Sequence, residues 1–147
     1  MIKTCNNILI KLEKDLSLLR SFKDFILIDF GAGDGTVLKH FSMLFKSTIG
    51  IDIDPQDSSV IKMDMIDYKF DDVPTVLYMY DPLYDSDTAE TIYNTVLDNF
   101  NKITETKYLI AYMDKNTQFI NNWCKKNGFR RKYSSSSYQI FRGTDNS

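Results

Sequence analysis

The chain has few cysteines, a single histidine and no long apolar run. Cys5 and Cys124 lie far apart in the sequence, a pattern that fits neither a disulfide framework nor a common zinc-ligand spacing. We therefore expect no metal, and a reducing compartment such as the cytoplasm. No apolar stretch approaches the length of a membrane-spanning helix, and the N-terminus lacks the apolar core of a signal peptide. A membrane protein is therefore not expected.

An excess of charge of one sign is also missing. The net charge of -2 at pH 7 argues against a generally basic nucleic-acid-binding protein. A local basic cluster lies within residues 125–132, and a solvated helix end is the favoured explanation for it. With 147 residues, of which 43% are hydrophobic, the chain is long enough to bury one core. We expect a single domain over residues 1–147.

The spacing of apolar residues predicts strands that alternate with helices. Helical periodicity covers roughly residues 6–22, 37–45, 89–103 and 119–127, and Asp87 with Glu90 is expected to cap the third helix. Strands are expected at residues 25–30, 48–53, 60–63, 75–80 and 108–113, followed by a hairpin over residues 129–141 with serines 134–137 at its tip. This order predicts an α/β fold with a doubly wound, mostly parallel sheet of about seven strands.

The strongest local pattern is a glycine-rich turn after the first predicted strand. Its sequence is Asp29-Phe30-Gly31-Ala32-Gly33-Asp34-Gly35. Glycines in a turn between a strand and a helix let the backbone approach a bound molecule closely. In a dinucleotide fingerprint the third glycine comes five residues after the first, whereas here Gly35 comes four after Gly31. The turn predicts a nucleotide-like cofactor of another kind; a glycine-rich turn without a ligand is the alternative.

This D-x-G-x-G-x-G pattern, together with Asp52 at the end of GIDID, resembles the first two motifs of class I S-adenosylmethionine (SAM)-dependent methyltransferases. The resemblance implies a Rossmann-like fold and SAM as the cofactor. It implies that the glycine turn passes under the methionine part, that Asp29 helps to hold its amino group, and that Asp52 takes the ribose hydroxyls. Asp64, in KMDMID, is expected beside the adenine, or else it caps a strand end. The implied cofactor-binding residues are Asp29, Gly31, Ala32, Gly33, Gly35, Asp52 and Asp64.

Two connections are shorter than this family leads us to expect. Only about five residues separate the second strand from the third, too few for the helical crossover that parallel neighbours usually need. The segment from Ile66 to Val73 is short as well. The sheet face near Ile61 and Met63 is therefore expected to lack its usual helix, and exposed apolar area favours association. We expect a homodimer or a partner subunit there.

A second motif follows the strand that ends at Tyr80. The sequence Asp81-Pro82-Leu83-Tyr84 resembles the D-P-P-Y motif of amino-group methyltransferases, with Leu83 in place of the second proline. The resemblance implies that Asp81 and the carbonyl group of Pro82 accept hydrogen bonds from the target amine, and that Tyr84 packs on the substrate. These three residues are the predicted catalytic set. The alternative is that Asp81 and Pro82 merely end a strand.

Together these features predict a SAM-dependent methyltransferase that acts on a nitrogen atom. The sequence has no room for a lid or an extra subdomain, so the expected substrate is a macromolecule, either protein or nucleic acid. One alternative is a catalytically silent module of this fold that binds SAM or a partner enzyme. A nicotinamide-dependent oxidoreductase is disfavoured by the glycine spacing and by the lack of a catalytic domain.

Overall fold

Seven strands form one mixed sheet in the computed structural model, which describes residues 2–16, 21–83 and 87–144. The strands are β1 (Ile26–Phe30), β2 (Ser47–Asp52), β3 (Ile61–Lys62), β4 (Thr75–Tyr80), β5 (Lys107–Tyr112), β6 (Arg130–Ser134) and β7 (Gln139–Arg142). Their order across the sheet is β3-β2-β1-β4-β5-β7-β6. All neighbours pair in parallel except β5 with β7 and β6 with β7. The predicted fold class is confirmed, including the antiparallel closing hairpin.

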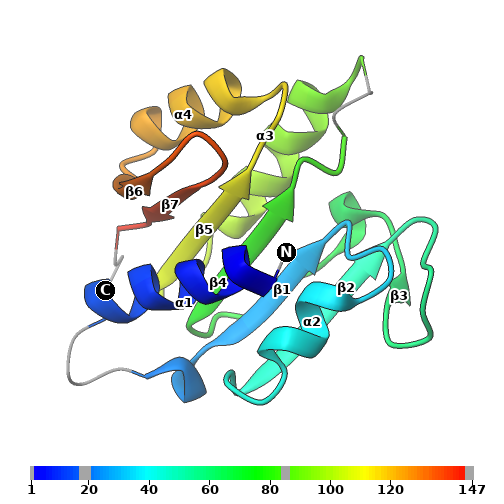
Figure 1. Cartoon of the computed structure of the whole chain (residues 1–147). Coiled ribbons are helices and arrows are strands. Elements are labelled where there is room, and N and C mark those ends of the chain that lie inside the picture. The colour runs from blue at the N-terminus through cyan, green and yellow to red at the C-terminus, as the bar shows by residue number, and fades with distance from the viewer. Residues whose placement is uncertain (1, 17–20, 84–86, 145–147) are drawn as a thin grey trace.

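Helices cover both faces of the sheet (Figure 1). They are α1 (Ile2–Asp15), α2 (Thr36–Phe41), α3 (Ala89–Phe100) and α4 (Thr117–Lys126). Because side chains alternate along a strand, neighbouring residues of β1 enter different cores. Leu27 packs in the core beneath α1 and α2, whereas Ile28 packs in the core beneath α3 and α4. No helix in the described part of the chain is both long and apolar enough to cross a membrane.

Several helix ends differ from the expectation. The first helix, expected over residues 6–22, covers Ile2–Asp15; residues 17–20 of the expected range lie outside the described residues, and a separate 3₁₀ turn (η1, Phe22–Asp24) leads into β1. The expected cap of α3 by Asp87 and Glu90 is wrong, since Thr88 occupies the N-cap position and makes no side-chain capping bond. Local polar residues favour a cap without fixing which of them takes it.

The second helix, α2, is shorter than its apolar pattern. It ends at Phe41, because the chain must turn back toward β2: the Lys46 amide donates a hydrogen bond to the carbonyl oxygen of Phe25. Leu44, expected on the buried face of this helix, is 37% exposed beyond its end.

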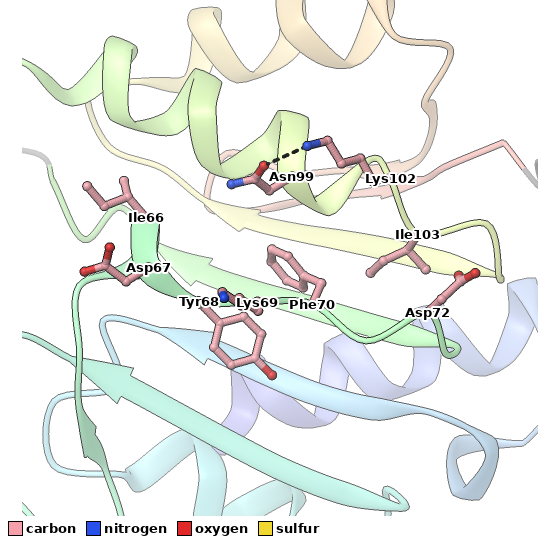
Figure 2. A pocket seen from close by; sticks show the side chains of 9 residues that line it. All are labelled: Ile66, Asp67, Tyr68, Lys69, Phe70, Asp72, Asn99, Lys102 and Ile103. Atoms are coloured by element: carbon pink, nitrogen blue, oxygen red, sulfur yellow. Dashed lines mark hydrogen bonds between the residues drawn. The ribbon is translucent and has the colours of Figure 1, made fainter.

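The two shortened connections exist as predicted, and an aromatic segment replaces one missing helix. Residues 53–60 join β2 to β3 without a helix, and only the 3₁₀ turn η2 (Met65–Asp67) lies between β3 and β4. The Tyr68 and Phe70 rings lie 5.6 and 5.8 Å from the ring of Phe30, and 5.0 Å from each other. Figure 2 shows this pair beneath α3. The sheet face expected to be bare is therefore partly covered by two aromatic side chains.

Two apolar side chains stay exposed at the sheet edge beside β3. Ile61 is 50% exposed and Ile53 is 65% exposed, whereas Met63 is partly buried against the core. A pocket of about 440 Å³ opens beside Tyr68 and Phe70, and Asn99 and Lys102 of the region around the end of α3 form its other wall (Figure 2). None of the predicted site residues lines this pocket.

Candidate active site

The glycine turn connects the carboxyl ends of β1 and β2. The amides of Gly31 and Ala32 both donate to the carbonyl oxygen of Ile51, over 2.9 and 3.0 Å. The Gly35 amide closes the turn by donating to the carbonyl oxygen of Ala32 over 2.9 Å. These bonds hold the turn against the end of β2, where the predicted ribose acceptor Asp52 lies.

Gly31 and Gly33 are needed for different reasons. Both have a left-handed backbone, with φ of 80° and 55°, a conformation that costs other residues about 1–2 kcal/mol. A Cβ atom on Gly31 would lie 2.6 Å from the Cβ atom of Pro82, so the turn packs directly against the second motif. A Cβ atom on Gly33 would meet no atom within 4 Å. The free space above the turn is therefore at Gly33.

Asp52 extends from the end of β2 toward this turn. Its Oδ2 atom accepts a hydrogen bond from the Gly33 amide, and its Oδ1 atom accepts one from the Asp54 amide, both over 2.9 Å. A carboxylate offers about four acceptor positions, and the side chain is only partly buried. Asp52 thus fixes the turn and keeps acceptor capacity for a pair of hydroxyl groups.

Asp29 is the most perturbed carboxyl group of the site. It is 2% exposed, and burial, with a smaller contribution from the nearby charge of Asp52, raises its pKa to about 8. Among the described residues it has no hydrogen-bond partner. Its neighbour across the β1–β4 pair is Tyr78, whose hydroxyl group is buried without a hydrogen-bond partner among the described residues. A buried polar group without a partner is costly, and a cationic ligand group would relieve that cost.

A groove of about 250 Å³ begins at the glycine turn. Its lining combines the ends of β1 and β2 with residues from the β3 region and from the second motif: Gly31, Ile51, Asp52, Ile53, Met63, Asp64, Met65, Pro82, Leu83 and Ile92. We call it the cofactor groove. Asp64 caps η2, because its Oδ1 atom accepts a hydrogen bond from the Ile66 amide over 3.1 Å, and it also lines the groove. The described residues include no group of three His, Cys, Asp or Glu side chains that could hold a metal ion.

Four hydrogen bonds from the described residues hold Asp81. The Tyr93 hydroxyl group and the Asn116 side-chain amide donate to its Oδ1 atom, each over 2.8 Å. The amides of Asp114 and Lys115 donate to its Oδ2 atom over 2.9 and 3.0 Å. Burial raises the pKa of Asp81, but the hydrogen bonds outweigh it and lower the pKa below its usual value. Asp81 is thus an ionised carboxylate that anchors the end of β4 to the segment between β5 and α4.

These bonds change what the second motif can do. The four donors use the acceptor positions that a carboxylate offers, so an amine reaches this carboxylate only if a donor leaves. Asp81 also has a left-handed backbone, with φ of 27°, and Tyr93 accepts a hydrogen bond from the Leu83 amide over 2.9 Å. The turn is therefore tightly fixed, and it holds Pro82 against Gly31 and the cofactor groove. Tyr84, the third predicted catalytic residue, lies outside the described residues.

A second cavity, of about 730 Å³, lies on the other side of Pro82. Residues from the ends of β4 and β5 and from the tip of the β6–β7 hairpin line it: Tyr80, Asp81, Pro82, Tyr112, Met113, Asp114, Ser136 and Ser137. We call it the substrate cavity. Pro82 lines both the substrate cavity and the cofactor groove. Molecules in these two spaces would therefore approach each other at Pro82.

The sequence pointed to Asp81 and Pro82, which line the substrate cavity, but not to the residues that hold Asp81 or to the rest of the cavity lining. Tyr93 was recognised only as a core position of α3, and nothing in the sequence singled out Asn116. Tyr112 fitted a buried strand and Ser136 a solvated turn. The hydrogen bonds of its hydroxyl group with Asp81 and Leu83 distinguish Tyr93 from other apolar-face residues of α3.

Comparison with known proteins identifies the fold. No protein-family model matches the chain, and no curated protein sequence is similar to it. Among solved structures, the N-methyltransferase NodS from Bradyrhizobium japonicum WM9 in complex with S-adenosylhomocysteine (SAH) has a TM-score of 0.63 at 13% identity, over 96% of this chain and 86% of NodS. Magnesium protoporphyrin IX methyltransferase (ChlM) from Synechocystis PCC 6803 with bound SAM has a TM-score of 0.57 at 16% identity, over 96% and 77%. The 23S rRNA methyltransferase ErmE has a TM-score of 0.54 at 13% identity, over 93% and 66%. The chain thus has the fold of class I SAM-dependent methyltransferases.

Proposed function

We propose that this protein is a SAM-dependent methyltransferase that transfers a methyl group to a nitrogen atom of a nucleic acid or a protein. The observation that carries the proposal is the position of Pro82. This residue packs on Gly31 and lines both the cofactor groove and the substrate cavity. A methyl donor in the groove would therefore be next to an acceptor in the cavity. NodS and ChlM, which share the fold, were crystallised with SAH and SAM.

The residues of the groove and of the glycine turn beside it fit the parts of SAM. The remaining acceptor positions of Asp52 suit the two ribose hydroxyl groups, and the free space at Gly33 leaves room for the ligand. Asp29 is buried and does not line the groove; it lies at the end of β1 below the glycine turn, and we assign it the ammonium group of the methionine part. Asp64, at the rim of the groove, suits the adenine amino group. When bound, SAM supplies a methyl group on a positively charged sulfur.

Methyl transfer to nitrogen is a direct displacement that needs alignment and an acceptor for the departing proton. Because four donors already use the Asp81 carboxylate, we assign Asp81 the role of positioning Pro82. The carbonyl oxygen of Pro82 accepts no hydrogen bond from the described residues, and we assign it the orientation of the target amine. Tyr84 packing on the substrate stays a prediction.

The test is a radiolabelled methyl-transfer assay on protein and nucleic-acid fractions from cells. The wild type is compared with Pro82→Gly, which removes the ring between the groove and the cavity but keeps a carbonyl group. We expect labelling by the wild type, and a loss on the order of a hundred-fold in the variant because the reacting groups lose their alignment. Equal labelling by both proteins would place the chemistry elsewhere.

A second function, a SAM-binding module without catalysis, is favoured by one observation. Four donors already fill the Asp81 carboxylate, so the turn from Asp81 to Leu83 has only main-chain groups left to orient an amine. Such a module would bind SAM in the groove and label no fraction in the assay. Binding without transfer therefore separates it from the enzyme.

We also propose that the exposed edge near Ile53 and Ile61 contacts a second copy or a partner subunit. Both side chains are at least half exposed beside the short edge strand β3. Light scattering across a range of concentrations tests self-association, and Ile53→Asp is the matched variant. A monomer at every concentration would remove the homodimer.

A further inference from the structure

Four tyrosine rings lie in a row beside the substrate cavity. The rings of Tyr80 and Tyr112 are stacked, with centroids 4.3 Å apart and planes 21° from parallel. The Tyr138 ring follows Tyr112 at 6.4 Å, again at 21°, and the Tyr133 ring lies 5.2 Å beyond Tyr138. The row thus runs from the end of β4 across β5 to the closing hairpin.

Tyr80 is the open end of this row. Tyr112 covers one face of its ring, yet Tyr80 is 47% exposed although it ends a strand whose other residues are buried. Both Tyr80 and Tyr112 line the substrate cavity, next to Pro82. The second face of the Tyr80 ring, on which no described residue stacks, is therefore open to the cavity, close to the predicted point of methyl transfer.

The arrangement favours a flat aromatic ligand over a cationic side chain. An aromatic cage for a lysine or methyl-lysine surrounds the cation with several ring faces. Here the first three rings are nearly parallel, so only the outermost ring presents a face. A flat heterocycle extends such a stack, and every nucleobase has a π-face that stacks on an aromatic side chain. We propose that the substrate cavity takes an unpaired nucleobase of a single-stranded nucleic acid, stacked on Tyr80.

The surroundings of the cavity suit a polynucleotide. Ser136 and Ser137, at the tip of the β6–β7 hairpin, line the cavity and carry hydroxyl groups that suit a base edge or a phosphate. The hairpin tip continues from β6, the free edge of the sheet, on which Arg130 and Arg131 are exposed. A strand that leaves the cavity along this edge would pass these two side chains, which extend to opposite faces of the sheet because they are neighbours in β6. This inference rests on the proposed function, because the base must meet the methyl donor at Pro82.

Binding of labelled oligonucleotides tests the inference without relying on catalysis. Fluorescence anisotropy measures the affinity of a mixed-sequence single-stranded RNA, the same sequence as DNA, its duplex and a lysine-containing peptide, all with SAH present. Tyr80→Leu keeps an apolar side chain and removes the ring, and Tyr80→Phe keeps the ring. We expect the single strand to bind better than the duplex, Tyr80→Leu to weaken it about five- to hundred-fold, and Tyr80→Phe to stay within about two-fold.

Several outcomes are decisive. A difference in affinity between the RNA and the DNA identifies which nucleic acid supplies the base. Competition by free nucleosides at comparable concentration would overturn the part of the inference that requires a polynucleotide. Equal affinities of Tyr80→Leu and the wild type, or preferential binding of the peptide, would overturn the inference. Unchanged thermal unfolding of both variants excludes a loss of fold. If calorimetry shows SAM binding while no oligonucleotide binds, only this inference fails; if SAM does not bind, the proposed function fails as well.

Discussion

Replacing Asp29 with asparagine should make the protein more stable and its cofactor binding weaker. Asp29 is 2% exposed, and burial, with a smaller contribution from Asp52, raises its pKa from 3.8 to about 8. Between these two values the folded chain holds a proton that the unfolded chain has lost. The free energy of unfolding of the wild type should therefore fall as the pH rises through this window, and level off above it.

The size of the effect follows from the shift. Each pKa unit corresponds to about 1.4 kcal/mol. The raised pKa of Asp29 should therefore make the free energy of unfolding about 4 kcal/mol lower at pH 7 than in strongly acidic solution. Asparagine has nearly the same shape and does not titrate. Its amide brings a desolvation cost of about 1–3 kcal/mol. We therefore expect Asp29→Asn to gain about 1–3 kcal/mol at pH 7, and to lose most of the pH dependence between pH 5 and 8.

Urea unfolding at several pH values measures the stability, and calorimetric titration with SAM measures the affinity of the same variant. Loss of a charge-assisted hydrogen bond costs about 1.5–3 kcal/mol, so the affinity should fall ten-fold or more while the stability rises. A residue with a purely structural role would lower the stability when replaced. Parallel stability curves for the variant and the wild type, or an unchanged affinity, would refute the reasoning.

Two further pairs of variants test the glycine turn and the Asp81 anchor. Gly31→Ala should lower the free energy of unfolding by about 2 kcal/mol or more, because its Cβ atom would lie 2.6 Å from Pro82 and the left-handed backbone adds a further cost. Gly33→Ala would meet no atom within 4 Å, so it should cost only about 1–2 kcal/mol and mainly weaken SAH binding. Equal effects of the two variants on stability in urea unfolding and on SAH affinity in calorimetry would contradict this. Asp81→Ala leaves four buried or half-buried donors without their acceptor and should lower the free energy of unfolding by about 2–5 kcal/mol. The control Asp114→Ala keeps the backbone amide that binds Asp81, so its free energy of unfolding should change little. If urea unfolding gave Asp81→Ala the same stability as the wild type, the carboxylate would not be an anchor.

The sheet could be predicted because its strands are short apolar runs separated by polar turns. β4 has the predicted bounds, Thr75 to Tyr80. All of its residues after Thr75 are apolar or aromatic, and Pro74 and Asp81 flank it. Helix ends were less predictable, since competing polar residues such as Asp87 and Thr88 are equally plausible caps. The covering of the sheet by Tyr68 and Phe70 was also missed. Two aromatic residues in a short segment show no helical periodicity, and only their contact with Phe30 reveals what they do.

The cofactor motif was visible in the sequence because it is local, whereas the support of the second motif is not. The glycines and Asp29 lie within one turn, and Asp52 ends the following strand. Asp81, by contrast, is held by Tyr93, 12 residues away, and by Asn116, 35 residues away. Hydrogen bonds over such separations depend on how the strands and helices pack. Sequence therefore indicated which residues form the turn after β4, but not that the Asp81 carboxylate is already engaged.

The most direct test of the account is calorimetric titration of the wild type and Asp52→Ala with SAM, SAH and NAD. Asp54→Ala serves as the matched control, because the bond to Asp52 comes from the Asp54 backbone amide and survives the substitution. We expect SAM and SAH to bind and NAD not to bind. Asp52→Ala should weaken SAM binding by about ten-fold or more, while Asp54→Ala should bind SAM like the wild type. Binding of NAD in preference to SAM, or the same SAM affinity in Asp52→Ala and the wild type, would contradict it.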